Sequence, residues 1–270
     1  EKNLEKKIEH IISNIKGVIL FKKQKFKSAE SEFLKSIQLD KNFIDPYKNL
    51  LKLNLKTKNF QSAIENGKKV IELDRQKNSI SYFNLALAYD LNKDYKQAIK
   101  NYKIVETLNF KEKKILFNNM AKCFLGERNI NDAKVYYLKA LEFDQNDKFI
   151  INNLLILYLS IGDKNNIEQF YKKAQQIDEN YIEFKLNKSD YFLSKDKVEE
   201  AIEILKSIIQ SSKNYIAYTK LAKIYSIIND NKKAVETIEE AITNYPDIND
   251  LKSTRGVLHL IEGQFEKGWE

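Results

Sequence analysis

The strongest constraint on the fold of this chain is a sequence period of 34 or 35 residues. The period is carried by an asparagine column, by an alanine column, and by a large apolar or aromatic column three residues before the alanine. The asparagine column holds Asn49, Asn84, Asn119, Asn153 and Asn187. The alanine column holds Ala29, Ala63, Ala98, Ala133, Ala201 and Ala234. Self-similarity at such a period predicts a stacked array of small supersecondary units.

The unit over residues 114–147 shows how each period is built. Residues 115–124 place apolar side chains at helical spacing, and residues 126–129 interrupt the pattern with turn-forming residues. Asn131 or Asp132 is predicted to cap a second helix, which continues through Ala133 to Leu141. Each unit is therefore predicted to be a pair of antiparallel helices, with the alanine where the two helices approach closely.

This pattern resembles the tetratricopeptide repeat. The small residue that the family carries at its eighth position is matched by Gly17, Ala86, Ala121, Ala222 and Gly256, and the one at its twenty-seventh by Ala140, Ala174 and Ala241. The resemblance implies an all-α, right-handed superhelical solenoid of antiparallel helix pairs, with seven full repeats and a truncated eighth. The repeats are predicted near residues 10–43, 44–78, 79–113, 114–147, 148–181, 182–214, 215–248 and 249–270, after an N-terminal helical extension over residues 1–9.

No motif in the sequence indicates catalysis. The seven glycines form no phosphate-binding loop, and His10 and His259 have no partner at the spacing of metal ligands. His259 is interpreted as a structural histidine, and Cys123 as a small core residue on the packed face of a first helix. We therefore predict no catalytic residue, no metal site and no cofactor.

Charge and composition limit the class of partner. The net charge is +8, but the cations are nearly all lysines that alternate with acidic residues, which disfavours a nucleic-acid reader. No segment has the apolar length of a membrane span, and neither a signal peptide nor a disulfide framework is visible. These features favour a cytoplasmic location.

The asparagine column is the candidate binding feature. The resemblance to the tetratricopeptide family implies that the first helices line a concave groove and that the sixth position of each repeat faces this groove. An asparagine amide offers a donor and an acceptor to a peptide backbone, and each such pair of bonds contributes about 0.5–1.5 kcal/mol. The arrangement is similar to the repeats of O-linked N-acetylglucosamine transferase, where an asparagine ladder holds extended polypeptide. The alternative is that the column is only repeat consensus; Lys220 and Thr254 interrupt it.

Other groove positions are expected to select the ligand. Lys48, Lys52 and Lys122 add positive charge, while Phe83 and Leu87 contribute to an apolar floor. The remaining floor residues are Ile115 and Phe149, and the opposing acidic residues are Asp45, Glu183 and Asp190. The predicted partner is a protein or extended peptide with central apolar residues and acidic residues near the second to fourth repeats.

Two further functions remain open from the sequence. The run at residues 265–270, which contains Phe265, Gly268 and Trp269, resembles the last repeat of bacterial proteins in which such arrays precede a glycosyltransferase domain. This resemblance predicts a substrate-recruiting arm of a larger enzyme. The third interpretation is an assembly scaffold that binds partner proteins on its convex face.

Overall fold

The computed structural model describes residues 2–74, 76–261 and 263, with side chains from residue 8 onward. Over these residues the chain forms helices and turns, and the prediction of an all-α fold is confirmed. The Phe265, Gly268 and Trp269 positions used above lie outside the described residues. The chain divides into two compact units, residues 1–145 and residues 146–270.

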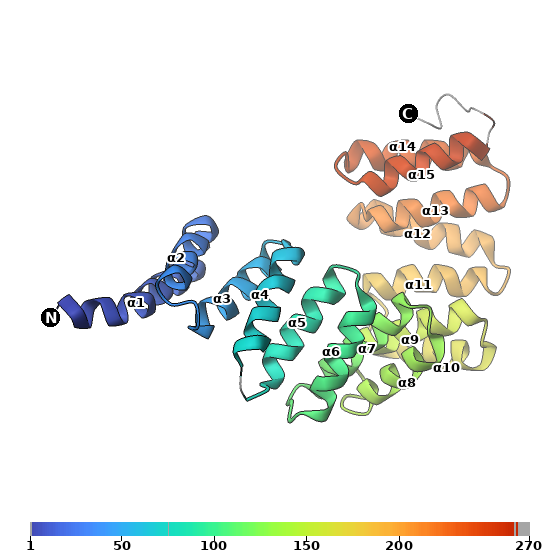
Figure 1. Cartoon of the computed structure of the whole chain (residues 1–270). Coiled ribbons are helices and arrows are strands. Elements are labelled where there is room, and N and C mark those ends of the chain that lie inside the picture. The colour runs from blue at the N-terminus through green and yellow to red at the C-terminus, as the bar shows by residue number, and fades with distance from the viewer. Residues whose placement is uncertain (1, 75, 262, 264–270) are drawn as a thin grey trace. The chain divides into compact units, whose positions relative to one another are not determined.

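The first unit holds four helix pairs (Figure 1). Its helices are α1 (Lys2–Lys22), α2 (Phe26–Leu39), α3 (Ile44–Lys56), α4 (Phe60–Leu73), α5 (Ser79–Leu91), α6 (Tyr95–Thr107), α7 (Lys113–Gly126) and α8 (Ile130–Leu141). From α1 to α8 each helix packs against its neighbour in this unit, and first helices of successive pairs also touch, α1 with α3 and α3 with α5. Residues 2–9 belong to α1 and are continuous with it.

The second unit holds three helix pairs and one further helix. Its helices are α9 (Lys148–Ile161), α10 (Lys164–Ile177), α11 (Ile182–Leu193), α12 (Val198–Ser212), α13 (Tyr215–Ile227), α14 (Asn231–Asn244) and α15 (Asn249–Ile261). Neighbouring helices lie side by side, as the yellow-to-red series from α11 to α15 in Figure 1 shows. The first helices again touch, α9 with α11 and α13 with α15.

The repeated small and large residues form the core between the helices. All six members of the alanine column are fully buried, as the close approach of the two helices in a pair requires. One turn further along every second helix except α4, which has Gly67 there, stands a large buried residue. These residues are Phe33, Tyr102, Tyr137, Tyr171, Leu205 and Ile238. The predicted packing role of the alanine column is confirmed, and so is the burial of Cys123 and His259.

The turn inside each pair has a fixed backbone conformation. One residue, two positions before the second helix, adopts a positive φ near 60° to 70°. These residues are Gln24, Lys58, Lys93, Arg128, Gly162, Asp196 and Asn229. Only one of them is glycine, so the remaining turns hold a side chain in a backbone region that L-residues rarely adopt.

The cap of α8 differs from the prediction. The helix begins at Ile130, and Asn129 caps it by accepting a hydrogen bond from the backbone N–H of Asp132 at 3.2 Å. The predictions of Asn131 and Asp132 were therefore wrong by two or three residues. The reason is that the large residue of the column starts the second helix, so the capping residue is the polar one directly before it.

Candidate ligand-binding site

A hollow on the first unit brings three of the predicted site residues together. It has a volume of about 180 Å³ and lies between α3 and α5. Lys48 and Lys52 line it from α3 and Asn84 from α5, next to the exposed side chain of Ile80. The structure thus places two cations, an amide and an apolar surface within one small concavity.

The polar side chains in this hollow differ in whether they already have a bonding partner. The Lys48 Nζ lies 3.6 Å from a carboxylate oxygen of Asp45, one turn earlier on α3, which partly neutralises it. Lys52 is exposed and makes no ion pair with the described residues. The Asn84 amide is half-buried and likewise makes no hydrogen bond within the described part of the chain. Of the three predicted site residues in the hollow, Lys52 and Asn84 are therefore the ones most able to form an ion pair or hydrogen bonds with a ligand.

The other asparagines mostly bond to neighbouring elements. Asn49 donates from Nδ2 to the Asn14 side-chain oxygen at 2.9 Å, and Asn119 donates to the Tyr102 hydroxyl at 3.5 Å, a long contact. Asn153 is half-buried and has its own polar contacts. An amide that donates one N–H keeps a second N–H and its oxygen, so Asn49 and Asn119 keep part of their capacity.

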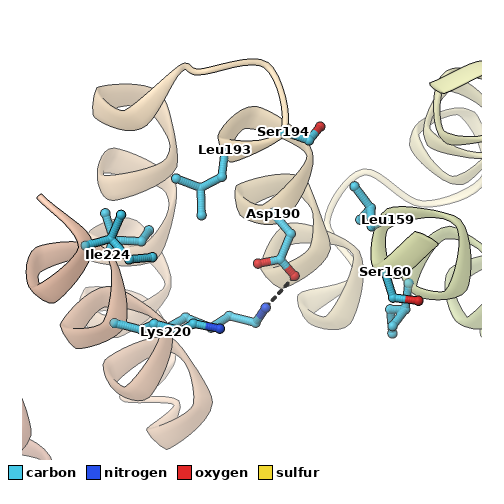
Figure 2. A pocket seen from close by; sticks show the side chains of 10 residues that line it. Leu159, Ser160, Asp190, Leu193, Ser194, Lys220 and Ile224 are labelled. Atoms are coloured by element: carbon cyan, nitrogen blue, oxygen red, sulfur yellow. Dashed lines mark hydrogen bonds and ion pairs between the residues drawn. The ribbon is translucent and has the colours of Figure 1, made fainter. Parts of the chain in front are cut away.

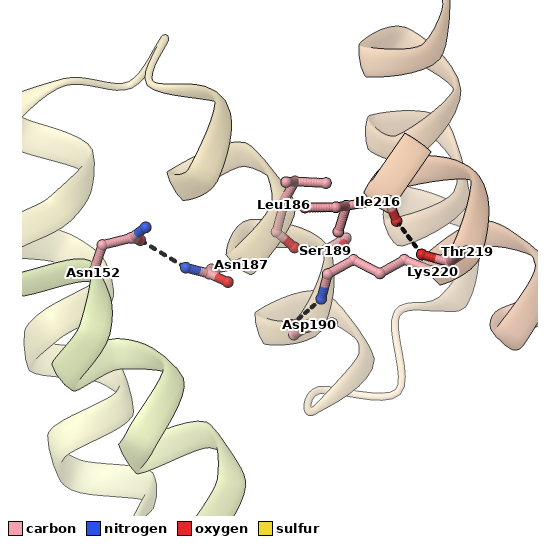
Figure 3. A network of polar contacts seen from close by, with 8 residues as sticks. All are labelled: Asn152, Leu186, Asn187, Ser189, Asp190, Ile216, Thr219 and Lys220. Carbon is pink, nitrogen blue, oxygen red and sulfur yellow. Dashed lines mark hydrogen bonds and ion pairs between the residues drawn. The ribbon is translucent and has the colours of Figure 1, made fainter. Parts of the chain in front are cut away.

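Asn187 differs from the rest of the column because it is buried. Only 5% of the residue is exposed, and its Nδ2 donates to the Asn152 side-chain oxygen at 2.8 Å (Figure 3). Asn152 is itself 4% exposed. The pair bridges α9 and α11 and leaves little of the amide accessible to a ligand.

Asn14 is a member of the column that the sequence reasoning missed. It precedes Asn49 by 35 residues, the same interval as between Asn49 and Asn84, and it is buried against that side chain. Starting the first repeat at His10 places Ile15 in the column, one residue too late. The interval of 35 residues was the signal that could have identified it.

The predicted apolar floor is only partly accessible. Phe83 stacks on Phe110, with ring centroids 4.7 Å apart, and also contacts the Tyr102 ring at 5.6 Å. Leu87 is half-buried, while Ile115 and Phe149 are exposed on α7 and α9. Phe83 therefore contributes mainly to packing at the α5–α6 pair.

A buried polar cluster lies beside the predicted Lys122. The Cys123 thiol on α7 donates a hydrogen bond to the Asp90 carboxylate on α5, and burial raises the pKa of that thiol above its ordinary value. Burial also raises the pKa of the Asp90 carboxyl group, although the Cys123 bond and the nearby Lys122 charge oppose the shift. Burial is likewise the main cause of the raised pKa of the Tyr102 hydroxyl. Lys122 is exposed and compensates Asp90 from the surface.

Replacing Asp90 with asparagine is expected to weaken the pH dependence of stability. A carboxyl group whose pKa is raised on folding binds protons more tightly in the folded chain, so its contribution is largest below its ordinary value of 3.8 and is lost as the pH rises through the raised pKa. Asp90→Asn should therefore be at least as stable as the wild type at neutral pH. The wild type should lose stability as the pH rises above 3.8, and the variant should not show this loss. Urea denaturation across the acidic range measures this. An unchanged slope would show that Asp90 is as well solvated when folded as when unfolded.

Among the described residues, no group of three or more histidine, cysteine, aspartate or glutamate side chains could hold a metal ion. No helix in the described part of the chain is both long and apolar enough to cross a membrane.

A second hollow lies on the second unit, on the first helices α9, α11 and α13. It has a volume of about 410 Å³ and is lined mainly by apolar side chains (Figure 2). An ion pair between Lys220 Nζ and an Asp190 carboxylate oxygen, 2.5 Å long, stands in its wall. The sequence reasoning noted both residues but did not place them together.

Comparison with known proteins identifies the repeats. The model of the tetratricopeptide repeat matches residues 80–111, 150–181 and 215–248, which correspond to the pairs α5–α6, α9–α10 and α13–α14. Among proteins of curated function, no sequence matches the chain.

Solved structures share the fold at low sequence identity. A tetratricopeptide repeat protein from Parabacteroides merdae is 18% identical, with a TM-score of 0.68 over 82% of this chain and 89% of its own. PilF from Pseudomonas aeruginosa is 15% identical, with a TM-score of 0.62 over 80% of this chain and 97% of its own. PilW, a type IV pilus biogenesis factor, is 11% identical, with a TM-score of 0.62 over 75% of this chain and 93% of its own.

These matches define the general class of the molecule. Tetratricopeptide repeats form protein–protein interaction modules and are generally non-catalytic scaffolds. The predicted helix pairs, their stacking within each unit and the three matched segments agree with one another. Three helix pairs of this chain are tetratricopeptide repeats, and its fold is that of a tetratricopeptide repeat array.

Proposed function

We propose that the chain binds an extended segment of another protein on the face formed by the first helices of its first unit, where α3 and α5 hold that segment. The observation that carries the proposal is the convergence of Lys48, Lys52 and Asn84 in one hollow. The Asn84 amide can donate to a backbone carbonyl and accept from a backbone N–H of the segment, independently of its sequence. Lys52 favours a carboxylate on the segment.

Exposed apolar surface at the hollow and on α7 supports the proposal. Ile80 is 57% exposed at the hollow, and Ile115 is 47% exposed on α7. Covering such side chains with an apolar residue of the partner removes their surface from water, at about 25 cal/mol for each Å². The preferred partner segment therefore alternates apolar and acidic residues, which matches the acidic peptide predicted from the sequence.

The asparagines are proposed to contribute unequally. Asn84 is the principal backbone contact, because its amide has no bond inside the described chain. Asn49, Asn119 and Asn153 are proposed as secondary contacts. Asn187 is the least accessible of the column, since it is buried against Asn152.

Fluorescence anisotropy of labelled peptides tests the proposed function. The probe alternates leucine and glutamate, and its twin carries lysine in place of glutamate. Asn84→Ala is expected to weaken binding of every peptide that binds by roughly 2- to 13-fold, the equivalent of about 0.5–1.5 kcal/mol. Lys52→Glu is expected to weaken the acidic probe alone, because it replaces an attractive charge by a repulsive one.

The matched control is Lys172→Glu, a charge reversal on the second helix α10 at a well exposed side chain. It should leave the affinity of both peptides unchanged. Equal binding of the acidic probe and its lysine twin by the wild type would refute the acidic preference. Loss of binding in Lys172→Glu but not in Asn84→Ala would instead favour the scaffold that uses second helices.

The recruiting-arm hypothesis stays a prediction. The residues on which it rests, 265–270, lie outside the described part of the chain. The coding sequence after residue 270 tests it. A following α/β sequence with a nucleotide-sugar site would support the hypothesis, and a stop codon soon after residue 270 would contradict it.

A further inference from the structure

The hollow on α9, α11 and α13 is built from apolar side chains of three successive first helices (Figure 2). Its apolar lining consists of Ile156, Leu159, Leu193, Ile224 and Ile227. Ligand pockets in proteins range over about 300–1,000 Å³, so a volume of about 410 Å³ fits one or two large side chains of a partner and not a whole folded element.

The rim of the hollow exposes apolar surface that none of the described residues of the second unit covers. Ile227 is 64% exposed and Ile156 is 44% exposed, whereas Ile224 at the bottom is 2% exposed. A concavity with a buried apolar floor and exposed apolar edges favours an apolar side chain that fills it, because both surfaces then leave water.

The charges at the hollow select what stands next to that side chain. Asp190 already forms an ion pair with the Nζ of Lys220 (Figures 2 and 3). Lys220 occupies the position at which other repeats carry the column asparagine. Lys223 also lines the hollow, is exposed, and makes no ion pair with the described residues. Two lysines against one aspartate leave an uncompensated positive charge, which attracts a carboxylate and repels a basic side chain.

We propose that this hollow binds a large apolar side chain of a partner segment whose neighbouring residue is aspartate or glutamate, with the carboxylate held by Lys223. The site deepens the proposed function and rests on it, since it supplies an anchor on the first helices of the second unit. It differs from the α3–α5 hollow in having no asparagine amide, so it recognises side chains and not the peptide backbone. Sequence preference is therefore strongest at this anchor.

Thiol protection reports occupancy of the hollow directly. The chain has one cysteine, Cys123, and it is buried, so a cysteine introduced by Ser160→Cys in the wall of the hollow is the reactive one. The probe peptide carries leucine followed by glutamate in a glycine–serine sequence. One twin replaces the leucine by serine, and the other replaces the glutamate by lysine. We expect the probe to slow modification of the new cysteine, and each twin to need roughly tenfold or more higher concentration for the same protection.

Substitutions of two exposed residues in the Ser160→Cys variant show which side chains contact the peptide. Ile227→Ser should weaken protection by the leucine-containing peptides, and Lys223→Glu should reverse the preference between glutamate and lysine. Matched controls are Val135→Ser, which changes an exposed apolar side chain on the second helix α8 of the first unit, and Ser253→Cys, an exposed position on α15 outside the hollow. Neither control should reproduce the effect.

The outcomes separate this inference from the proposed function. If labelled peptides bind in an Asn84- and Lys52-dependent manner but leave the Ser160→Cys thiol unprotected, the hollow is not an anchor and the proposed function stands. Equal protection by all three peptides, or protection unaffected by Ile227→Ser, would also overturn the inference. If no peptide binds by anisotropy, the proposed function fails and this inference fails with it.

Discussion

Replacing Asn187 with alanine is expected to lower the free energy of unfolding of the second unit by about 1–3 kcal/mol. Asn187 is 5% exposed, and its Nδ2 donates at 2.8 Å to the side-chain oxygen of Asn152, which is 4% exposed. Removing the donor leaves the Asn152 oxygen buried without this partner, and a buried polar group without a hydrogen bond is costly. Asn84→Ala should change stability by less, since Asn84 is half-buried and, among the described residues, has no partner to leave unsatisfied.

A double-mutant cycle separates the pair from the cavity that alanine creates. Asn152→Ala and Asn187→Ala together should cost less than the sum of the two single changes, because the double variant leaves neither amide unpaired. Urea denaturation, followed with hydrogen exchange of the α9 and α11 amides, locates the loss, as repeat arrays can unfold in parts. If Asn187→Ala costs no more than Asn84→Ala, the pair does not hold α9 and α11 together. The column would then have one role throughout.

The asparagine column illustrates what the sequence could and could not predict. The interval of 34 or 35 residues correctly indicated equivalent positions on successive first helices. It could not distinguish accessible Asn84 from buried Asn187, because the difference depends on the residue opposite. Asn152 stands opposite Asn187, one position before the column residue of its own repeat, and only the packing of α9 against α11 brings the two side chains together.

The fold was more predictable than the site for a physical reason. Burial of the alanine column follows from the local geometry of one helix pair, which every repeat reproduces. A hollow depends on side chains from two or three helices and on their rotamers. Phe83 shows this, since its ring turns towards Phe110 and not towards the open face. Lys220 shows it as well, because the residue that interrupts the asparagine column forms an ion pair with Asp190 in the preceding repeat.

Replacing Gly17 with alanine is expected to destabilise the first unit, although alanine is the better helix former. A Cβ atom at Gly17 would lie 2.5 Å from Phe33 Cε1 and 2.6 Å from its Cδ1, too close for carbon atoms. The Phe33 ring is 1% exposed and cannot turn towards solvent. Overpacking of a core costs about 1–3 kcal/mol, against the gain of up to about 1 kcal/mol that alanine has over glycine in a helix. The expected net loss in thermal or urea denaturation is about 1–2 kcal/mol.

The sign of this effect should reverse when the ring is removed. Phe33→Leu deletes ring atoms that the new methyl group would meet, so Gly17→Ala in that background keeps the helix-forming gain and fills space that the ring vacates. We therefore expect Gly17→Ala to be neutral or stabilising in Phe33→Leu, and destabilising in the wild type. A gain in both backgrounds would show that α1 and α2 are not in close contact at this position. A loss in both would show that an atom other than those of the Phe33 ring excludes a side chain at Gly17.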